Sequence, residues 1–370
     1  MSKKYYLINH LLERYPDCQY YVVYGERSNG KTYSTLRYFL NEYFTKGHKF
    51  AYIRRWKEDI KQKNMNQLFT GLVENNEIYK LSKGKYTNIV YRNRAFYLVK
   101  EDKETKEQTV EDIAICYIYV LTEEEHDKGV TSPDIKNILF DEFIARRTYL
   151  PEEFVTFTNV LSSIIRDRND VKIIMLGNTI NRFSPYFTEM GLTNVKTQEK
   201  GTVDIYTYGD SGLKVAVEFS DLPAKKKRSD IYFAFNNPKL QMITKGTWEI
   251  AVYPHLTKDM KYLPKDIKYI YFIEFDDIIL QCEIVKLNGI IFTFIHQKTT
   301  PIKDDTKSLV YTFKSSPKPN YRRNILKPFT TVEKAILDMF KKDKVFYQNN
   351  EIGDVVRNYI NNCMNPNIRI

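Results

Sequence analysis

An eight-residue stretch near the start of the chain combines two glycines, a lysine and a threonine at the spacing that phosphate binding requires. It matches the pattern G-x-x-x-x-G-K-[ST] at every fixed position. Its glycines allow consecutive backbone N–H groups to curl around a phosphate, and a following helix adds its partial positive charge. We expect Lys31 to reach the terminal phosphates and the Thr32 hydroxyl to ligate Mg²⁺. The residues expected to hold the nucleotide are Gly25, Glu26, Arg27, Ser28, Asn29, Gly30, Lys31 and Thr32.

A second motif, about 110 residues later, supplies two adjacent carboxylates after an apolar run. Residues 138–140 read Ile-Leu-Phe and are followed by Asp141 and Glu142. A buried strand of this kind carries its aspartate to the Mg²⁺ shell, and the next glutamate can polarise an attacking water molecule. The pattern is common by itself, but its distance from the first motif leaves room for intervening strands. Together the two motifs predict one ATP–Mg²⁺ site.

The elements that must position these residues follow from periodicity. A β-type run at 19–24 precedes the glycine-rich stretch, and apolar residues recur at helical spacing from 36 to 44. Further buried strands are expected at 50–53, which ends in Arg54-Arg55-Trp56-Lys57, and at 171–176. The basic residues after the former strand would face phosphates, a partner subunit or only solvent. Asn178 follows the strand at 171–176 and is either a sensor of the γ-phosphate or a turn residue.

Length and composition limit the architecture. A chain of 370 residues is too long for one ordinary core, so two domains and a connector are expected. We place the domains at 1–197 and 256–370, with the connector at 198–255. The sequence contains no membrane-span candidate and no signal-peptide core, which suggests a cytosolic protein without membrane association. Four cysteines lie far apart and lack metal-ligand spacing, so buried free thiols are expected.

Positive charge is concentrated in the C-terminal part. Residues 1–223 hold 32 Lys and Arg against 31 Asp and Glu, whereas residues 224–370 hold 25 against 15. This asymmetry favours an anionic partner, nucleic acid first and a membrane surface second. The run Lys225, Lys226, Lys227 and Arg228 opens the basic part; it is a candidate nucleic-acid contact or a solvated loop.

The C-terminal domain is predicted to combine strands and helices. Three β-runs follow one another between residues 269 and 296, and Asn288-Gly289 forms a hairpin turn between the last two. Three sequential antiparallel strands open a ribonuclease H-type fold, and also many other α+β folds. Two helices are expected after them, the first with a capping box at Thr330 and Glu333.

The motifs exclude some classes of nucleotide-binding protein. The chain lacks the N-K-x-D motif with which signalling GTPases read their base. Adjacent Asp141 and Glu142 are typical of ATPases that convert hydrolysis into motion, and many of these work as rings. In such a ring, a neighbour's arginine stabilises the transferred phosphoryl group. Arg166, at a predicted helix end, is the candidate for that finger and would otherwise be a surface arginine.

The N-terminal 190 residues resemble a known family. The similarity lies in Gly25 to Thr32, in residues 52–57 and 138–144, in Arg166-Asp167-Arg168, and in residues 176–178 leading to 185–187. These segments resemble the DNA-encapsidation ATPases of small podoviruses, the salasmavirus-type, prohead-RNA-dependent packaging motors related to large terminases. The resemblance implies an additional-strand (ASCE-type) P-loop ATPase domain with a mainly parallel sheet, a β-rich connector and an α+β ribonuclease H-like domain.

The resemblance also implies partners and residue roles. It implies an ATP- and Mg²⁺-dependent motor that moves double-stranded DNA into a preformed capsid as a homo-oligomeric ring. The ring would be pentameric, would contact the portal and the prohead packaging RNA, and would dock transiently on the prohead in the host cytoplasm. By position, Asp141 would bind Mg²⁺, Glu142 would activate water, Arg166 would act in trans and Asn178 would be the sensor. Lys128 matches a lid lysine that acts in cis.

Two alternatives stay open from the sequence. One is a terminase large subunit with an active nuclease, because carboxylates that could hold two metal ions lie near the predicted C-terminal strands: Glu274, Asp276, Asp277 and Glu283, with Asp354 further on. A turn at residues 276–277 is preferred to that nuclease site. The other alternative is a structural nucleic-acid-binding protein in which nucleotide only orders an oligomer.

Overall fold

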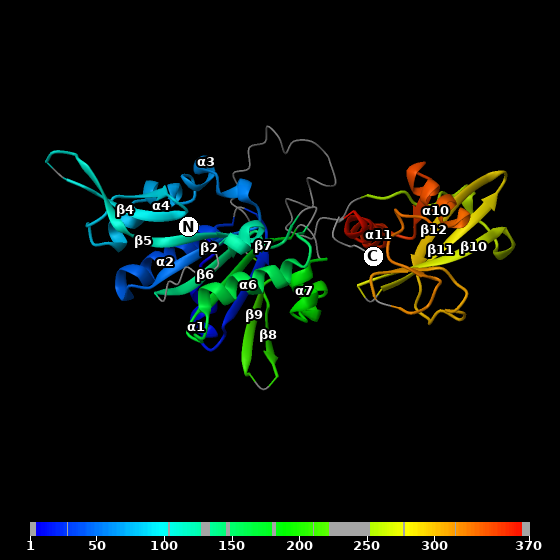
Figure 1. The fold of residues 1–370 in the computed structure, drawn as a ribbon, viewed down its shortest axis with the longest axis horizontal. Helices are drawn as coiled ribbons and strands as arrows, with labels where there is room; N and C mark the ends of the chain where they lie inside the picture. The colour runs from blue at the N-terminus through cyan, green and yellow to red at the C-terminus, as the bar shows by residue number, and fades with distance from the viewer. Residues whose placement is uncertain are drawn as a thin grey trace. The chain divides into compact units, whose positions relative to one another are not determined.

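The computed structural model describes residues 5–27, 29–102, 104–126, 134–145, 149–179, 183–209, 211–221, 252–276, 278–314 and 316–364. These residues form two compact units, one on each side of the segment 222–251. Each unit has its own β-sheet (Figure 1).

The first unit is built on a nine-stranded, mainly parallel sheet. Six consecutive strands in its middle are parallel, and antiparallel strands continue it at both edges. In spatial order the strands are β3 (Asn88–Arg92), β4 (Ala95–Glu101), β5 (Gln108–Val120), β2 (Lys49–Arg54), β6 (Ile135–Asp141), β7 (Lys172–Asn178), β1 (Tyr20–Gly25), β9 (Leu213–Ser220) and β8 (Val203–Tyr208).

Helices and apolar side chains cover both faces of this sheet. On β1, Tyr21 and Val23 belong to the core cluster that includes residues of α2, whereas Val22 and Tyr24 belong to the cluster with residues of α6 and α7. Burial on both faces explains why this strand is apolar without alternation. The helices are α1 (Asn9–Arg14), α2 (Lys31–Lys46), α3 (Gln62–Met65), α4 (Thr70–Glu74), α5 (Glu77–Leu81), α6 (Glu153–Ile165) and α7 (Pro185–Glu189), with 3₁₀ turns η1 (Lys57–Ile60), η2 (Leu121–His126) and η3 (Thr193–Lys196).

The boundary of the first unit differs from the position expected from the sequence. Residues 198–220 were assigned to a connector, but β8 and β9 complete the main sheet, and β9 pairs in parallel with β1. The short β-runs around 203–217 therefore belong to the first unit. Residues 222–251 of the expected connector lie outside the described residues.

The second unit contains a six-stranded mixed sheet. The strands β10, β11 and β12 are antiparallel in sequence order, β13 pairs in parallel with β10, β14 with β13, and β15 with β12. The predicted hairpin turn is confirmed, because Asn288 and Gly289 have φ values of 49° and 80°. In spatial order the strands are β14 (Tyr321–Arg322), β13 (Val310–Thr312), β10 (Ile267–Phe275), β11 (Ile278–Leu287), β12 (Ile290–Gln297) and β15 (Val345–Tyr347).

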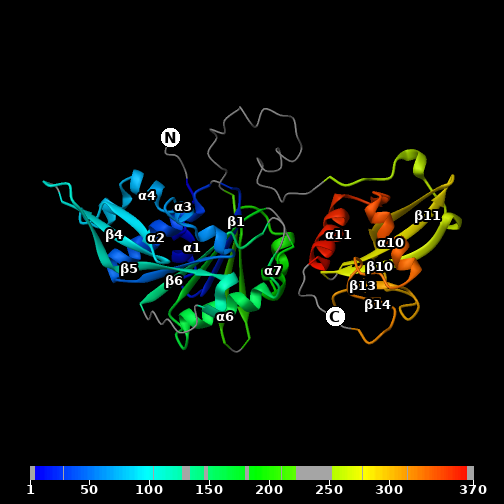
Figure 2. The ribbon, with the colours of Figure 1, turned by 45° about the horizontal axis from the view of Figure 1, so that its top comes forward.

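Two helices, α10 (Thr331–Lys341) and α11 (Asn350–Cys363), accompany the second sheet, with 3₁₀ turns η4 (Lys258–Met260) and η5 (Pro264–Asp266) (Figure 2). The Thr330 hydroxyl accepts a hydrogen bond from the Glu333 N–H, which is one half of the predicted capping box, whereas the Glu333 carboxylate accepts the Phe329 N–H rather than that of Thr330. All four cysteines are buried free thiols. Within the described part of the chain, the helices are too short or too polar to cross a membrane.

Candidate nucleotide site

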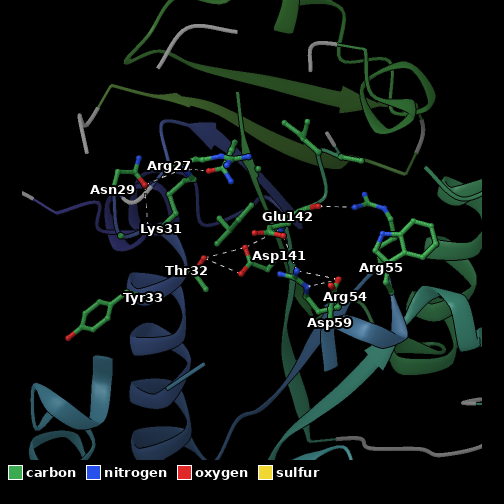
Figure 3. A pocket seen from close by; sticks show the side chains of 17 residues that line it. Arg27, Asn29, Lys31, Thr32, Tyr33, Arg54, Arg55, Asp59, Asp141 and Glu142 are labelled. Atoms are coloured by element: carbon green, nitrogen blue, oxygen red, sulfur yellow. Dashed lines mark hydrogen bonds and ion pairs between the residues drawn. The ribbon is translucent and has the colours of Figure 1, made fainter. Parts of the chain in front are cut away.

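A cleft of about 680 Å³ lies where four parallel strands end (Figure 3). Its walls come from the loops that follow β1, β2 and β6, from the end of β7 and from the first turn of α2. Ligands of open α/β sheets bind at this edge, because the carboxyl ends of parallel strands and the amino ends of the following helices meet there. The two sequence motifs, far apart in the chain, are therefore brought to one place.

The glycine-rich loop is shaped by local constraints at both of its glycines. A Cβ atom on Gly25 would lie 3.0 Å from the backbone oxygen of Ser220 on the neighbouring strand β9. Gly30 directly precedes α2 and has a φ of 94°, in the left-handed region that favours glycine. Between them, Glu26 and Asn29 are buried and Arg27 lines the cleft. Ser28 lies outside the described residues.

Lys31, the first residue of α2, turns its ammonium group back into this loop. Its Nζ donates hydrogen bonds to the Glu26 carbonyl oxygen at 2.6 Å and to Asn29 Oδ1 at 3.2 Å. Burial lowers the pKa of the Lys31 ammonium to about 8, and the nearby Asp141 carboxylate opposes that change. The site thus holds a partly desolvated cation among acceptors, where phosphate oxygens would be strong partners.

Asp141 and Thr32 form a pair of oxygen ligands with the chemistry that Mg²⁺ prefers. The Thr32 hydroxyl lies 3.3 and 3.1 Å from the two Asp141 carboxylate oxygens. The Tyr52 hydroxyl donates to the same carboxylate at 3.2 Å. Burial raises the pKa of Asp141, and the Arg54 guanidinium opposes this. A hydroxyl and a buried carboxylate fit a Mg²⁺ ion, which takes few protein ligands and completes its shell with water and phosphate oxygens.

Glu142 stands in the turn that follows β6. Its φ is 59°, a left-handed value that is uncommon for a non-glycine residue. Its carboxylate accepts a hydrogen bond from Arg54 at 2.9 Å, and more than half of the side chain is exposed. Arg54 also pairs with Asp59. The candidate base is therefore accessible to a reacting water molecule and held by a neighbouring cation.

The remaining predicted site residues have different outcomes. Asn178 ends β7 at the cleft, and its Oδ1 lies 3.5 Å from Lys31 Nζ. Arg166 is exposed at the end of α6 and is not among the residues that line the cleft. Lys128 and the run Lys225, Lys226, Lys227 and Arg228 lie outside the described residues.

The structure adds contacts that the sequence did not indicate. Tyr52 donates a hydrogen bond to Asp141. The position of Tyr52 in an apolar strand did not indicate this contact. Arg55 was expected to face phosphates, a partner or solvent, but it is 5% exposed and forms an ion pair with Glu153. The guanidinium is therefore bound to a carboxylate 98 residues away in the sequence, a contact that the local sequence pattern did not indicate.

Gly177 has a packing role beside the Glu142 turn. A Cβ atom at this position would lie 2.6 Å from Ile144 Cδ1 and 2.9 Å from Phe143 Cε1. The Phe143 N–H also donates to the Leu176 carbonyl oxygen at 3.1 Å. The glycine next to Asn178 therefore lets the turn after β6 pack closely on β7.

Comparison with known proteins identifies relatives of this chain by sequence. The DNA packaging protein of Bacillus phage phi29 is 25% identical over 168 residues, which is 45% of this chain and 44% of that protein. The DNA packaging protein of Bacillus phage B103 is 24% identical over 173 residues, 46% of this chain and 47% of that protein. The chain spans less than half the length of these curated relatives in the matched regions.

Two solved structures share the fold over nearly the whole chain. The bacteriophage Phi-29 viral genome packaging motor assembly aligns with a TM-score of 0.58 and 20% identity, covering 96% of this chain and 97% of that one. The Phi-28 gp11 DNA packaging motor aligns with a TM-score of 0.54 and 17% identity, covering 98% and 99%. The family described as Podovirus DNA encapsidation protein (Gp16) matches residues 1–206, more than half of the sequence. The cleft lies within those residues, and the chain belongs to the Podovirus DNA encapsidation protein (Gp16) family.

Proposed function

We propose that this chain is the ATPase of a motor that moves double-stranded viral DNA into a preformed capsid. The observation that carries the proposal is the convergence of Lys31, Thr32 and Asp141 in one cleft, with Glu142 directly after Asp141. The relatives are described as DNA packaging proteins, which supports DNA as the polymer that is moved. The basic excess of residues 224–370 supports an anionic partner.

The chemistry follows from the side chains at the cleft. The loop N–H groups and Lys31 would bind the phosphates of ATP, while Thr32 and Asp141 would hold Mg²⁺. When bound, this ion neutralises the charge that develops on the phosphate oxygens. Glu142 would take a proton from the attacking water. Asn178 would respond to the γ-phosphate, and the distance of 3.5 Å between its Oδ1 and Lys31 Nζ supports this role.

Finer fold assignments are part of the proposal. Strand β7 lies between the phosphate-loop strand β1 and the acidic strand β6, which supports the additional-strand (ASCE-type) class of P-loop ATPases. In the second unit, the order β12-β11-β10-β13-β14, with β13 and β14 parallel to β10, supports a ribonuclease H-like topology. Its parallel strands are short: β13 has three residues and β14 two.

We propose that the second unit binds nucleic acid without nuclease activity. Glu274 on β10 forms an ion pair with Lys314 at 2.8 Å, so a cation occupies the place next to the central carboxylate. Glu283 is buried and accepts hydrogen bonds from Tyr262 and Gln281. Asp276 has a φ of 51° between β10 and β11, as a turn residue would, and Asp277 lies outside the described residues. Glu274 and Glu283 are thus engaged with protein donors, and the described residues hold no group of three or more acids, histidines or cysteines that could bind a metal ion.

The first experiment is steady-state ATP hydrolysis with and without double-stranded DNA. We expect Mg²⁺-dependent turnover that DNA raises and that EDTA abolishes, because Thr32 and Asp141 act through the ion. Turnover of the purified full chain is measured at one ATP concentration without DNA, with DNA, and with DNA and EDTA. Tight ATP binding without hydrolysis at any DNA concentration would instead support a nucleotide that only orders an oligomer.

The assembly is proposed on the same basis. One of the aligned structures is described as a motor assembly, which supports a motor of several chains. We propose that this motor is a pentameric ring of identical chains at the viral portal, in contact with the prohead packaging RNA. The ring would work in the host cytoplasm, docked transiently on the prohead. Lys128 is proposed as a cis lid residue, and Lys225 to Arg228 as contacts with DNA or RNA; both lie outside the described residues.

Arg166 is proposed as the residue that one subunit offers to its neighbour's ATP. Arg168, two residues later, donates to the carbonyl oxygen of Ile135, the first residue of β6. The end of α6 therefore lies at the sheet edge opposite the cleft, about 20 Å away along a seven-residue strand. This distance supports action in trans.

Mixing mutant subunits tests that role. In a ring that contains both Arg166→Ala and Glu142→Gln subunits, a trans residue predicts turnover that departs from the weighted sum of the two pure variants. Turnover of mixtures is measured against the fraction of each variant. A strictly linear dependence for every mixture would remove Arg166 from the neighbour's site.

A further inference from the structure

We propose that Arg55 is a positioning residue that holds the backbone of the Glu142 turn, and that Glu153 in turn holds Arg55. The inference rests on the proposed function, because it assigns a role in ATP hydrolysis. It concerns a buried side chain at the wall of the cleft, whose guanidinium is bonded to the Glu142 turn and to Glu153.

Arg55 donates hydrogen bonds to the two carbonyl groups that directly follow Asp141. One terminal nitrogen lies 3.1 Å from the Glu142 carbonyl oxygen and the other lies 2.6 Å from the Phe143 carbonyl oxygen. Glu142 has a left-handed backbone conformation, which is unfavourable for an L-residue. A strained conformation of this kind persists only where its surroundings fix it. The two hydrogen bonds from Arg55 provide such a constraint at the residue that carries the base.

Glu153 fixes the other side of the guanidinium. It is the first residue of α6, is 1% exposed, and accepts hydrogen bonds from Arg55 Nε at 2.9 and 2.8 Å. The Tyr186 hydroxyl and the Leu150 N–H also donate to this carboxylate, at 2.8 and 2.7 Å. With all these donors in place, the guanidinium has little freedom to move.

A buried ion pair by itself adds little to the stability of a fold, so the Arg55–Glu153 pair is better explained by a role in positioning. The desolvation of two charges offsets most of their attraction, and apolar replacements are often as stable. An arginine that reaches two carbonyls and a carboxylate at once, however, fixes geometry through its planar fork. The pair therefore places the Glu142 turn relative to β2 and α6.

Adjacent arginines then act on different parts of the same glutamate. Successive residues of a strand point to opposite sides, and Arg54 and Arg55 leave the end of β2 in different directions (Figure 3). Arg54 pairs with the Glu142 carboxylate, whereas Arg55 binds the Glu142 carbonyl group. The side chain can thus exchange partners while the main chain stays fixed.

The conservative variant Arg55→Lys tests the proposal in the full-length protein. A lysine keeps the charge beside Glu153, but its compact ammonium cannot span both carbonyls and the carboxylate. We expect kcat for ATP hydrolysis to fall by about 10- to 100-fold, as small displacements of catalytic groups do. The KM for ATP should change less than about twofold, because the phosphate loop is untouched. An unchanged kcat would overturn the proposal.

A matched control separates positioning from general loss of stability. Glu333 in the second unit is also nearly fully buried, pairs with Arg322 at 3.2 Å, and accepts the Phe329 N–H at 2.8 Å just before helix α10. Arg322→Lys therefore makes the same chemical change beside a carboxylate that is also nearly fully buried, although the Arg322 side chain is more exposed than that of Arg55. Basal turnover of this variant should stay within about twofold of wild type. An equal loss of kcat in both variants would also overturn the proposal.

Amide hydrogen exchange gives a readout that needs no hydrolysis, so failure of the proposed function is distinguishable. The Phe143 N–H is bonded to the Leu176 carbonyl oxygen and reports on the turn. In Arg55→Lys we expect its exchange to accelerate at least about tenfold, with amides in the middle of α2 unchanged. If Arg55→Lys does not fold, Tyr186→Phe, which removes one donor to Glu153, should accelerate the same amide to a smaller degree. Unchanged exchange at Phe143 contradicts the proposal even if the wild type hydrolyses no ATP.

Discussion

Glu142→Gln is expected to leave ATP binding intact and to lower turnover by at least about 100-fold. Glutamine has the same shape as glutamate but cannot take the proton of the attacking water. Loss of the ion pair with Arg54 should change the free energy of unfolding little, because the Glu142 side chain is more than half exposed. Single-turnover hydrolysis and equilibrium binding of a fluorescent ATP analogue measure the two effects separately.

The control for this substitution is Glu58→Gln. Glu58 is an exposed acid in the short helix η1, close in the chain to Arg54, and its backbone oxygen rather than its carboxylate accepts from Asn64. Its loss removes the same charge without touching the proposed base, so turnover should remain within about twofold. If Glu142→Gln keeps more than a tenth of wild-type turnover, Glu142 is not the general base.

The parts of the site that were predictable from sequence are those built from contiguous residues on predictable elements. Gly25 to Thr32 contains the turn, the cation and the hydroxyl within eight residues, and β6 ends on Asp141. Because parallel strands end at one edge of the sheet, the two motifs had to meet. The hydrogen bonds between Thr32 and Asp141 follow from that rule and from little else.

Contacts between distant residues were not predictable in the same way. Arg55 and Glu153 each look like ordinary charged residues, and neither position has a periodic signal that identifies its partner. The two short parallel strands of the second unit, β13 and β14, are below the length at which alternation is detectable. The sequence predicts a connector where β9 and the edge strand β8 lie, because the pairing of β9 with β1 is a long-range property of the sheet.

Lys31→Met is expected to remove ATP-dependent stabilisation without lowering the stability of the nucleotide-free protein. Burial already holds the pKa of the Lys31 ammonium at about 8, so the charged form is disfavoured in the folded state relative to water. Methionine has a similar length and needs no hydration. The hydrogen bonds to Glu26 and Asn29 are lost, which offsets part of the gain. Thermal unfolding with and without saturating MgATP measures both quantities.

Two changes in the unfolding midpoint distinguish a lysine that binds ATP from one that stabilises the fold: the change without nucleotide and the change in the increment that MgATP adds. A ligand at 100 times its Kd stabilises a protein by about 2.7 kcal/mol, and this increment should vanish in Lys31→Met. The matched variant Lys46→Met changes a lysine in the last turn of the same helix, whose side chain is exposed and pairs with Glu42; it should keep the whole increment. A lower nucleotide-free midpoint with the ATP increment preserved would mean that Lys31 serves the fold rather than the phosphates.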